Sequence, residues 1–353
     1  MTSNNTLGRC FQLTTYGESH GPEIGGVVDG CPSGIPLEEG LVQSELDLRK
    51  PGKSTASTSR MEGDRVRLLS GVFHGVTTGA PIGFSIANRE QRSAEYEKLK
   101  DVYRPGHADY TYAAKYGVRD YRGGGRSSAR ETACRVAGGA VAQQFLRSKG
   151  ISVTAYTRKL GGIEAEVIAP EQAAQHPYFA PDPSVVELWE KRLKKMRKIG
   201  DSIGGLVEIR AQGVPAGLGE PVFDKLDARL SHALMSVGAV KAVEVGAGTD
   251  ASELRGSQNN DPLLEEGFAQ NNAGGILGGI SSGQPIVLRA AVKPIPSISL
   301  PQRTINTRGQ ETSLQIQGRH DASAIPRIVP VLKAMTLLVL ADMWILHLGP
   351  GHG

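Results

Sequence analysis

Three short matches between the two halves of the chain, occurring in the same order, constrain its fold most strongly. Residues 71–82, GVFHGVTTGAPI, align without gaps on residues 275–286, GILGGISSGQPI. Residues 30–34, GCPSG, match residues 213–217, GVPAG. Each half then reaches a Gly-Arg pair that precedes a long apolar segment. Self-similarity of this kind indicates a duplicated supersecondary unit, so we predict two related halves.

Hydrophobic periodicity and turn residues predict the elements of these halves. In chain order they are strands at residues 11–16 and 24–29, a helix at 37–48, paired strands within 66–88, a helix that ends near Gly150, a peripheral amphipathic helix at 184–197, a strand at 206–214, a helix at 226–237, a strand at 240–245, paired strands within 276–292 and a helix at 324–347. We therefore predict an α+β fold in one domain, residues 1–353, built from two interlocked strand–helix–hairpin–helix units, roughly residues 10–150 and 200–348, related by a pseudo-twofold axis.

The charge pattern favours a small anionic ligand over a nucleic acid. The net charge of +4 is mild, and the basic residues are dispersed, without interleaved aromatic side chains. Cys10, Cys31 and Cys134 fit neither a disulfide framework nor a metal-ligand spacing, which favours a reducing compartment. The N-terminus lacks the apolar core of a signal peptide, and Asp342 interrupts the apolar residues 334–348. We therefore expect a buried helix there, no membrane span and a cytoplasmic protein.

The strongest functional signal lies in residues 104–150, where three glycines lead into a predicted helix. Five arginines occur between positions 104 and 130, and the loop GGGRSS follows the third of them. Ser128 and Glu131 have the spacing of a capping box, which predicts a helix start at this point. Free backbone N–H groups at a helix start favour an anion, although a loop that merely turns is the alternative. The loop lacks the Gly-Lys-Ser/Thr ending of a Walker A motif.

Loop histidines are the candidates for proton transfer. His20, His107 and His320 each lie beside a glycine or a carboxylate, and imidazole exchanges a proton near neutral pH. A structural role for each, a divalent-metal site with neighbouring aspartates and a nucleophilic role for Ser19 are the alternatives. The basic residues 49–60 form either a solvated loop or a mobile flap over an anion.

Four motifs together resemble those of the chorismate synthases. They are GESHG at residues 17–21, RPGHAD at 104–109, DYRGGGRSSARETA at 120–133 and GRHD at 318–321, and the resemblance extends over essentially the whole chain. It implies a lyase that converts 5-enolpyruvylshikimate 3-phosphate to chorismate and phosphate, the last step of the shikimate pathway. It also implies a need for reduced FMN without net redox change, a β-α-β sandwich fold and a homotetramer.

The resemblance implies roles for individual residues. His20 would be the acid near the departing phosphate, His107 would protonate the reduced flavin, and Asp321 would act with the flavin at substrate C6. The substrate-binding residues would be Ser19, Arg49 and Arg130, and the flavin-binding residues would be Arg126, Ser127, Ser128, Gly238, Ala239, Gly278, Lys293, Pro294, Ile295, Pro296, Ser297 and Arg319. Several arginines in one site suit a substrate with two carboxylates and a phosphate, because guanidinium groups pair with both kinds of anion.

Two positions depart from the usual family pattern. Thr55 stands where the flap commonly carries an arginine, with Lys53 nearby, and Ala322 replaces a common proline. No segment resembles a nicotinamide-binding domain, so we expect an external flavin reductase, with NADPH-dependent reduction by the protein itself as the alternative. A metal-dependent phosphate-ester hydrolase or lyase and a non-catalytic flavin-binding protein are the other function classes.

Overall fold

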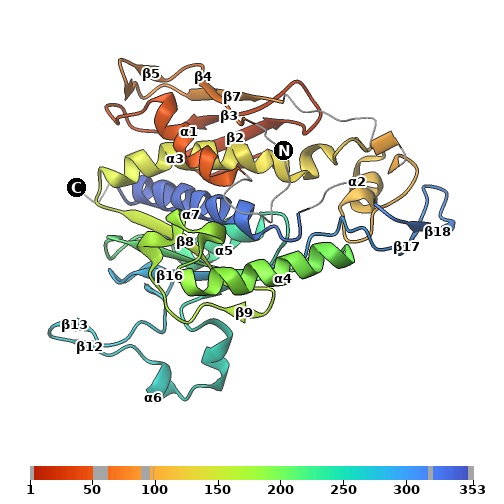
Figure 1. Ribbon diagram of the computed structural model, residues 1–353. Helices are drawn as coiled ribbons and strands as arrows, with labels where there is room; N and C mark the ends of the chain where they lie inside the picture. The colour runs from red at the N-terminus through yellow and green to blue at the C-terminus, as the bar shows by residue number, and fades with distance from the viewer. Residues whose placement is uncertain (1–3, 51–62, 89–95, 98, 317–320, 349–353) are drawn as a thin grey trace.

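Two antiparallel five-stranded sheets form the outer layers of the molecule (Figure 1). The computed structural model describes residues 4–50, 63–88, 96–97, 99–316 and 321–348. The first sheet contains, in spatial order, β1 (Thr6–Leu7), β2 (Gln12–Gly17), β3 (Glu23–Asp29), β7 (Ile82–Ala87) and β4 (Val66–Leu68). The second contains β11 (Val240–Val245), β16 (Ile286–Val292), β10 (Gly205–Gln212), β8 (Ser152–Leu160) and β9 (Ile163–Glu164).

A layer of helices fills the space between the sheets (Figure 1). Its members are α1 (Glu39–Arg49), α3 (Thr132–Arg147), α5 (Leu226–Met235) and α7 (Ile325–His347). Helix α3 contacts β2 and β3, whereas α7 contacts β8 and β10, and the two helices pack against each other. The predicted α+β class is therefore confirmed, and the arrangement is a sheet–helix–sheet sandwich.

Two adjacent glycines allow α3 to approach both of its neighbours closely. A Cβ atom on Gly138 would come within 2.8 Å of the Leu13 side chain in β2, and one on Gly139 within 2.4 Å of the Ala334 Cβ in α7. Each glycine costs the helix about 1 kcal/mol relative to alanine. The close packing of three layers offsets that cost, because apolar side chains on both sides of α3 are removed from water.

Smaller elements surround the sandwich. Helices α2 (Asp109–Tyr116) and α4 (Val186–Ile199) lie at its periphery, and residues between β11 and β16 project from the body as an arm that carries α6 (Gly256–Asn259) and the hairpin β12 (Leu263–Leu264) and β13 (Gly267–Phe268) (Figure 1). Three further hairpins are β5 (Val72–Phe73) with β6 (Val76–Thr77), β14 (Ile276–Leu277) with β15 (Ile280–Ser281), and β17 (Gln302–Ile305) with β18 (Glu311–Leu314).

The elements predicted from periodicity all form, within a few residues of their predicted bounds. Strand β8, helix α2 and the hairpin β17–β18 were not predicted. Both sheets share one order of strands along the chain and in space: β2-β3-β7-β4 in the first sheet corresponds to β8-β10-β16-β11 in the second. In each sheet a helix follows the second of these strands: α1 follows β3, and α5 follows β10. A two-stranded hairpin comes before the next strand that pairs with it, since β5–β6 precedes β7 and β14–β15 precedes β16.

Asp342 explains the charge within the most apolar helix. Its buried carboxylate accepts hydrogen bonds from the backbone N–H groups of Arg9, Cys10 and Phe11, at 2.9, 2.7 and 3.0 Å. The carboxylate thereby fixes the turn that leads into β2. Helix α7 is long and apolar enough to cross a membrane by length and composition, but 83% of its most apolar window is buried inside the fold. The prediction of a buried helix is confirmed.

Substitution Asp342→Asn should lower the free energy of unfolding by roughly 2–3 kcal/mol, because an amide cannot replace a buried carboxylate that accepts from three backbone donors. Urea denaturation followed by circular dichroism measures the change. Glu187→Gln, at an exposed i,i+4 pair with Lys191, is the matched control and should leave the midpoint unchanged. An Asp342→Asn protein as stable as the parent would contradict this account of the N-terminal turn.

Candidate active site

The loop of three glycines lies between the first sheet and the N-terminal end of α3. Gly123, Gly124 and Gly125 all have positive φ angles, 65°, 89° and 53°, a conformation that side chains disfavour. Two short 3-10 turns, η2 (Gly125–Ser127) and η3 (Ala129–Glu131), then connect the loop to α3. The segment predicted to bind an anion is thus a run of turns that leads into α3.

The predicted capping box does not form. Ser128 caps the turn η3, where its hydroxyl accepts from the Arg130 N–H at 3.4 Å. Glu131 instead turns toward β2 and along α3, accepting from the Thr15 hydroxyl at 3.0 Å and from Arg135 Nε at 2.9 Å. The prediction was half wrong, because the sequence spacing could not show that a threonine and an arginine would compete for the glutamate.

His20 packs directly on the first glycine of the loop. A Cβ atom on Gly123 would lie 2.4 Å from both His20 Cε1 and Ser19 Oγ, so only glycine fits there. Ser19 Oγ lies 2.8 Å from His20 Nδ1, and the ring of Tyr96 meets the imidazole edge-on at 5.1 Å between centroids. These contacts orient the His20 ring from three sides.

His107 packs in the same way on the second glycine. A Cβ atom on Gly124 would lie 2.9 Å from His107 Cε1 and 3.3 Å from Nε2. His107 Nδ1 is 3.0 Å from Asp109 Oδ1, while the Ser127 hydroxyl donates to the Gly124 carbonyl at 2.7 Å. Two imidazoles predicted as proton-transfer groups, 87 residues apart in the chain, therefore contact successive residues of one loop.

The predicted segment from Lys293 to Ser297 borders the His107 loop. Lys293 Nζ donates to the Gly106 carbonyl at 2.7 Å, and a Cβ atom on Gly106 would lie 3.2 Å from Pro296. The Lys293 N–H also binds the carbonyl of Ala239 at 2.9 Å, which brings in Gly238 and Ala239 at the end of α5. Burial and the neighbouring charge of Lys241 lower the pKa of the Lys293 ammonium. This side of the candidate site therefore carries the positive charge of Lys293.

Asp321 joins the same region through the backbone. The carbonyl of its neighbour Ala322 accepts from the Ile203 N–H at 2.8 Å, and the adjacent Ser202 hydroxyl donates to the Ile295 carbonyl at 2.6 Å. The Asp321 carboxylate forms an ion pair with Arg327 Nε at 2.9 Å. The predicted residues Arg319 and His320, and the flap positions Lys53 and Thr55, lie outside the described residues.

Gly278 lies apart from the other predicted flavin residues. The carbonyl of Gly279, next to it, accepts from the first N–H of α5, whereas Gly238 follows the end of that helix. Ten helical residues separate the two positions, which corresponds to about 15 Å. Within one chain, the structure therefore does not bring Gly278 to Ala239.

Arg126 binds the first sheet. Its guanidinium donates to the Thr15 hydroxyl at 2.7 Å, to the Thr15 carbonyl at 3.2 Å and to the Gly17 carbonyl at 3.1 Å. These contacts tie the loop to the end of β2, immediately before Ser19 and His20. The sequence predicted a cation at this junction but gave no sign that its acceptors would be a strand end.

Arg49 and Arg130 converge on a carboxylate that sequence reasoning missed. Arg49 Nη1 binds one oxygen of Asp64 at 2.9 Å, and Arg130 Nη1 binds the other. Each of the remaining guanidinium nitrogens also has a protein acceptor, on Thr132 and Ala129 for Arg49 and on Asn88 and Ala87 for Arg130. All three charged side chains are at least nine-tenths buried. Arginine-rich sequences suggest anion ligands, but no spacing rule pairs these two with Asp64.

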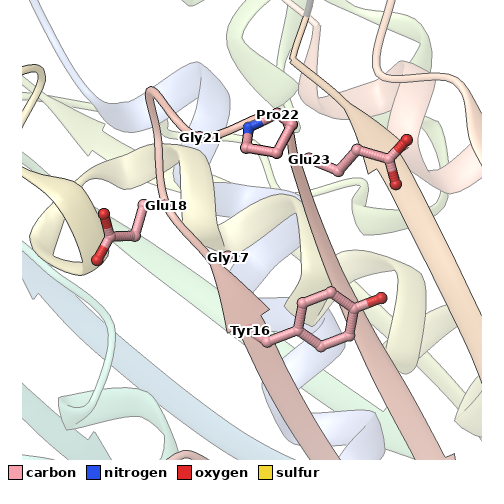
Figure 2. Close-up of a pocket in the computed structure, with 6 residues that line it drawn as sticks. All are labelled: Tyr16, Gly17, Glu18, Gly21, Pro22 and Glu23. Carbon is pink, nitrogen blue, oxygen red and sulfur yellow. The ribbon is translucent and has the colours of Figure 1, made fainter.

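A hollow of about 540 Å³ opens beside the β2–β3 turn, and it is lined by Tyr16, Gly17, Glu18, Gly21, Pro22 and Glu23. Figure 2 shows the Glu18 and Glu23 carboxylates on opposite sides of this turn, with the Tyr16 ring below. Its charged lining residues are both acidic, so the hollow does not suit a polyanion. Among the described residues, no group of three or more His, Cys, Asp and Glu side chains is arranged to hold a metal ion.

Comparison with known proteins assigns the family. The family model described as chorismate synthase matches residues 11–345. The chain belongs to the chorismate synthase family. It is 63% identical to the chorismate synthase of Maridesulfovibrio salexigens over 98% of this chain and 99% of that protein, and 64% identical to that of Nitratidesulfovibrio vulgaris strain Hildenborough over 98% of each. A crystal structure of chorismate synthase superposes with a TM-score of 0.78 and 32% identity, covering 97% of this chain and 94% of the other. The predicted resemblance is confirmed.

Substitution Gly123→Ala should lower the turnover of this protein in the chorismate synthase reaction by on the order of 10²-fold, because the new methyl group would displace His20 and Ser19 by about 1 Å. Gly117→Ala is the matched control: its φ of 71° carries the same backbone strain, yet its Cβ would meet no atom within 4 Å. Melting temperature and turnover are measured for both. Equal losses of turnover in the two variants would show backbone strain alone and contradict the packing role of Gly123.

Substitution Asp64→Asn should destabilise the protein by about 3 kcal/mol, because it leaves two buried guanidiniums without their shared carboxylate. Urea denaturation gives the change in unfolding free energy. Glu311→Gln removes the carboxylate of an exposed pair with Arg303 and should have no measurable effect. If Asp64→Asn changed the unfolding free energy no more than Glu311→Gln does, the arginine cluster would not depend on its carboxylate.

Proposed function

We propose that the protein is a lyase that converts 5-enolpyruvylshikimate 3-phosphate to chorismate and inorganic phosphate by trans-1,4 elimination, with reduced FMN as its cofactor. The observation that carries this proposal is the packing of His20 and His107 on successive glycines of one loop. A 1,4 elimination needs an acid at the leaving group and a second proton-transfer group elsewhere, and two imidazoles packed against one loop can serve both ends of a small substrate.

The proposed role of His20 is to protonate the departing phosphate. Ser19 Oγ lies 2.8 Å from His20 Nδ1, so the serine can orient the ring and present Nε2 for proton donation. Ser19 would also contact the substrate directly. Asp321, at the start of the segment that leads into α7, would act with the flavin at substrate C6, and its ion pair with Arg327 Nε, at 2.9 Å, orients the carboxylate.

The residues around the glycine loop fit a flavin phosphate and ring. Glycine positions without side chains, the backbone at Gly238 and Ala239, and the Lys293 ammonium offer donors and close approach. The residues proposed to hold FMN are Arg126, Ser127, Ser128, Gly238, Ala239, Lys293, Pro294, Ile295, Pro296, Ser297, Arg319 and, from its separate place in the chain, Gly278. Reduced FMN supplies electron density for breaking the C–O bond and regains it, so the reaction has no net redox change. His107 would hold the proton exchanged with the flavin.

Arg49 and Arg130 would assist the substrate through charge. Two guanidiniums against the single carboxylate of Asp64 leave a net positive charge in a buried setting. Charge of this kind attracts a substrate with two carboxylates and a phosphate, and it acts more strongly in a low-dielectric region than in water.

We also propose the organisation that family membership implies. The chain would form a single domain with an internal pseudo-twofold repeat, supported by the matching strand orders of the two sheets. It would act in the cytoplasm as a homotetramer and receive reduced flavin from an external reductase. The three free cysteines are compatible with a reducing compartment.

An anaerobic assay tests the function. Purified protein should convert the phosphorylated enolpyruvyl substrate to chorismate when FMN has been photoreduced, and it should not do so with oxidised FMN. NADPH with oxidised FMN, in place of light, shows whether the protein reduces its own flavin. Lack of chorismate under photoreduction, with a folded protein, would overturn the proposal.

Histidine variants test the assignment of roles within that assay. His20→Ala and His107→Ala should each lower kcat by roughly 10²–10⁴-fold, because each removes a proton-transfer group. His176→Ala is the control, since this half-buried ring hydrogen-bonds to the Ala180 carbonyl, away from the glycine loop. Near-parental turnover of either loop variant between pH 6 and 9 would make that histidine structural.

A further inference from the structure

Asp109 is the most heavily bound carboxylate next to the glycine loop. It is the first residue of α2, and its side chain is only 2% exposed. It accepts hydrogen bonds from the Arg104 backbone N–H at 3.1 Å, from Arg104 Nε at 2.7 Å and from Arg104 Nη2 at 2.8 Å. Arg119 Nη1 lies 3.2 Å away, and His107 Nδ1 completes the set at 3.0 Å.

We propose that Asp109 is a positioning residue for His107, which holds the neutral ring as its Nδ1–H tautomer and leaves Nε2, beside Gly124, as the atom that exchanges a proton. This inference rests on the proposed function for its catalytic meaning, but the tautomer itself does not. It assigns a role to a residue that acts through His107 and was not among the predicted catalytic or binding residues.

The tautomer follows from the donors around the carboxylate. Despite burial, hydrogen bonds from Arg104 and His107 and the charge of Arg104 hold the pKa of Asp109 well below its usual range. An ionised carboxylate can only accept hydrogen bonds, so the hydrogen of a neutral His107 ring must lie on Nδ1. The other ring edge then faces the loop, where Nε2 is 3.3 Å from the position of a Cβ on Gly124. A carboxylate beneath an imidazole fixes ring orientation in the same way in other acid–base sites.

The two arginines explain why the carboxylate can be buried here. A lone carboxylate would cost several kcal/mol to bury, and Arg104 together with Arg119 offsets that cost. Arg119 is itself anchored on the carbonyls of Leu99 and Lys100, at 3.0 and 2.7 Å. The carboxylate below His107 is therefore held by side chains that are themselves anchored on the fold.

Charged groups from the other neighbouring elements also face the His107 loop. Lys293 binds the carbonyl of Gly106, and His20 packs on Gly123. Asp120 lies beside Gly125 and pairs with Arg122, at 2.9 Å from Nε to Oδ1. Among the described residues, Asp109 is the carboxylate within hydrogen-bond distance of an imidazole nitrogen of His107, so it is the one expected to set the tautomer.

Long-range ¹⁵N–¹H correlation spectra of protein labelled with ¹⁵N-histidine test the tautomer without any activity. At a pH where the ring is neutral, His107 should show the Nδ1–H pattern, whereas neutral histidine side chains in water favour Nε2–H. The signals are assigned by their loss in His107→Ala. An Nε2–H pattern for His107 in the parental protein would overturn the inference, and this arm needs no variant of Asp109 to fold.

Asp109→Asn and Asp120→Asn then separate the positioning role from a general loss of structure. Asp109→Asn should shift His107 toward Nε2–H and lower kcat by about 10²–10⁴-fold with a smaller change in KM, because the wrong tautomer presents the wrong atom. Asp120→Asn should leave the His107 pattern unchanged. An unchanged tautomer in Asp109→Asn, or a changed tautomer with parental kcat, would overturn the positioning role. Failure of the proposed function would appear differently, as absence of turnover in the parental protein.

Discussion

The contact between a bare backbone loop and two imidazole rings is the constraint on which the site depends. At Gly123 and Gly124 a single added carbon atom would overlap His20 in one case and His107 in the other. Positive φ angles at the same residues turn the chain so that successive positions face different rings. Two histidines far apart in sequence can therefore act within the space of one small substrate, and the distance between them is set by a dipeptide.

The sandwich holds this loop from several directions. Helix α3, which follows the loop, is pressed against β2 through Gly138 and against α7 through Gly139. Arg126 ties the loop to the end of β2, immediately before the turn that carries Ser19 and His20. The cluster of Arg49, Asp64 and Arg130 joins α1, the edge of the first sheet and the start of α3 with charged hydrogen bonds in a buried setting, where breaking one partner is costly.

Much of the fold could be predicted because its signals are local. Alternation along β2 and β16 and the apolar run of α7 are properties of short windows, and each is reproduced by the structure. The glycine loop and the loop histidines were also readable, since turn residues and imidazoles are conspicuous. The motifs RPGHAD and DYRGGGRSSARETA sufficed for the family, which the comparisons confirm.

The pairing of charges could not be read in the same way. Five arginines in residues 104–130 suggested anionic ligands, yet Arg104, Arg119 and Arg130 bind aspartates of the protein itself. Asp64 and Asp109 meet these arginines only after folding, and nothing in their spacing predicts which carboxylate an arginine will choose. Glu131 shows the same limit, because its competing partner Thr15 lies 116 residues away in sequence. Long-range polar contacts are a property of the tertiary structure.

The most direct test of this account is an anaerobic crystal structure of the protein with FMN and 5-enolpyruvylshikimate 3-phosphate bound. The account predicts both ligands against the glycine loop, with the substrate phosphate within hydrogen-bond distance of His20 and the flavin beside His107 and Lys293. Ligands bound elsewhere, or a complex in which Gly123 and Gly124 no longer contact the two imidazoles, would contradict it.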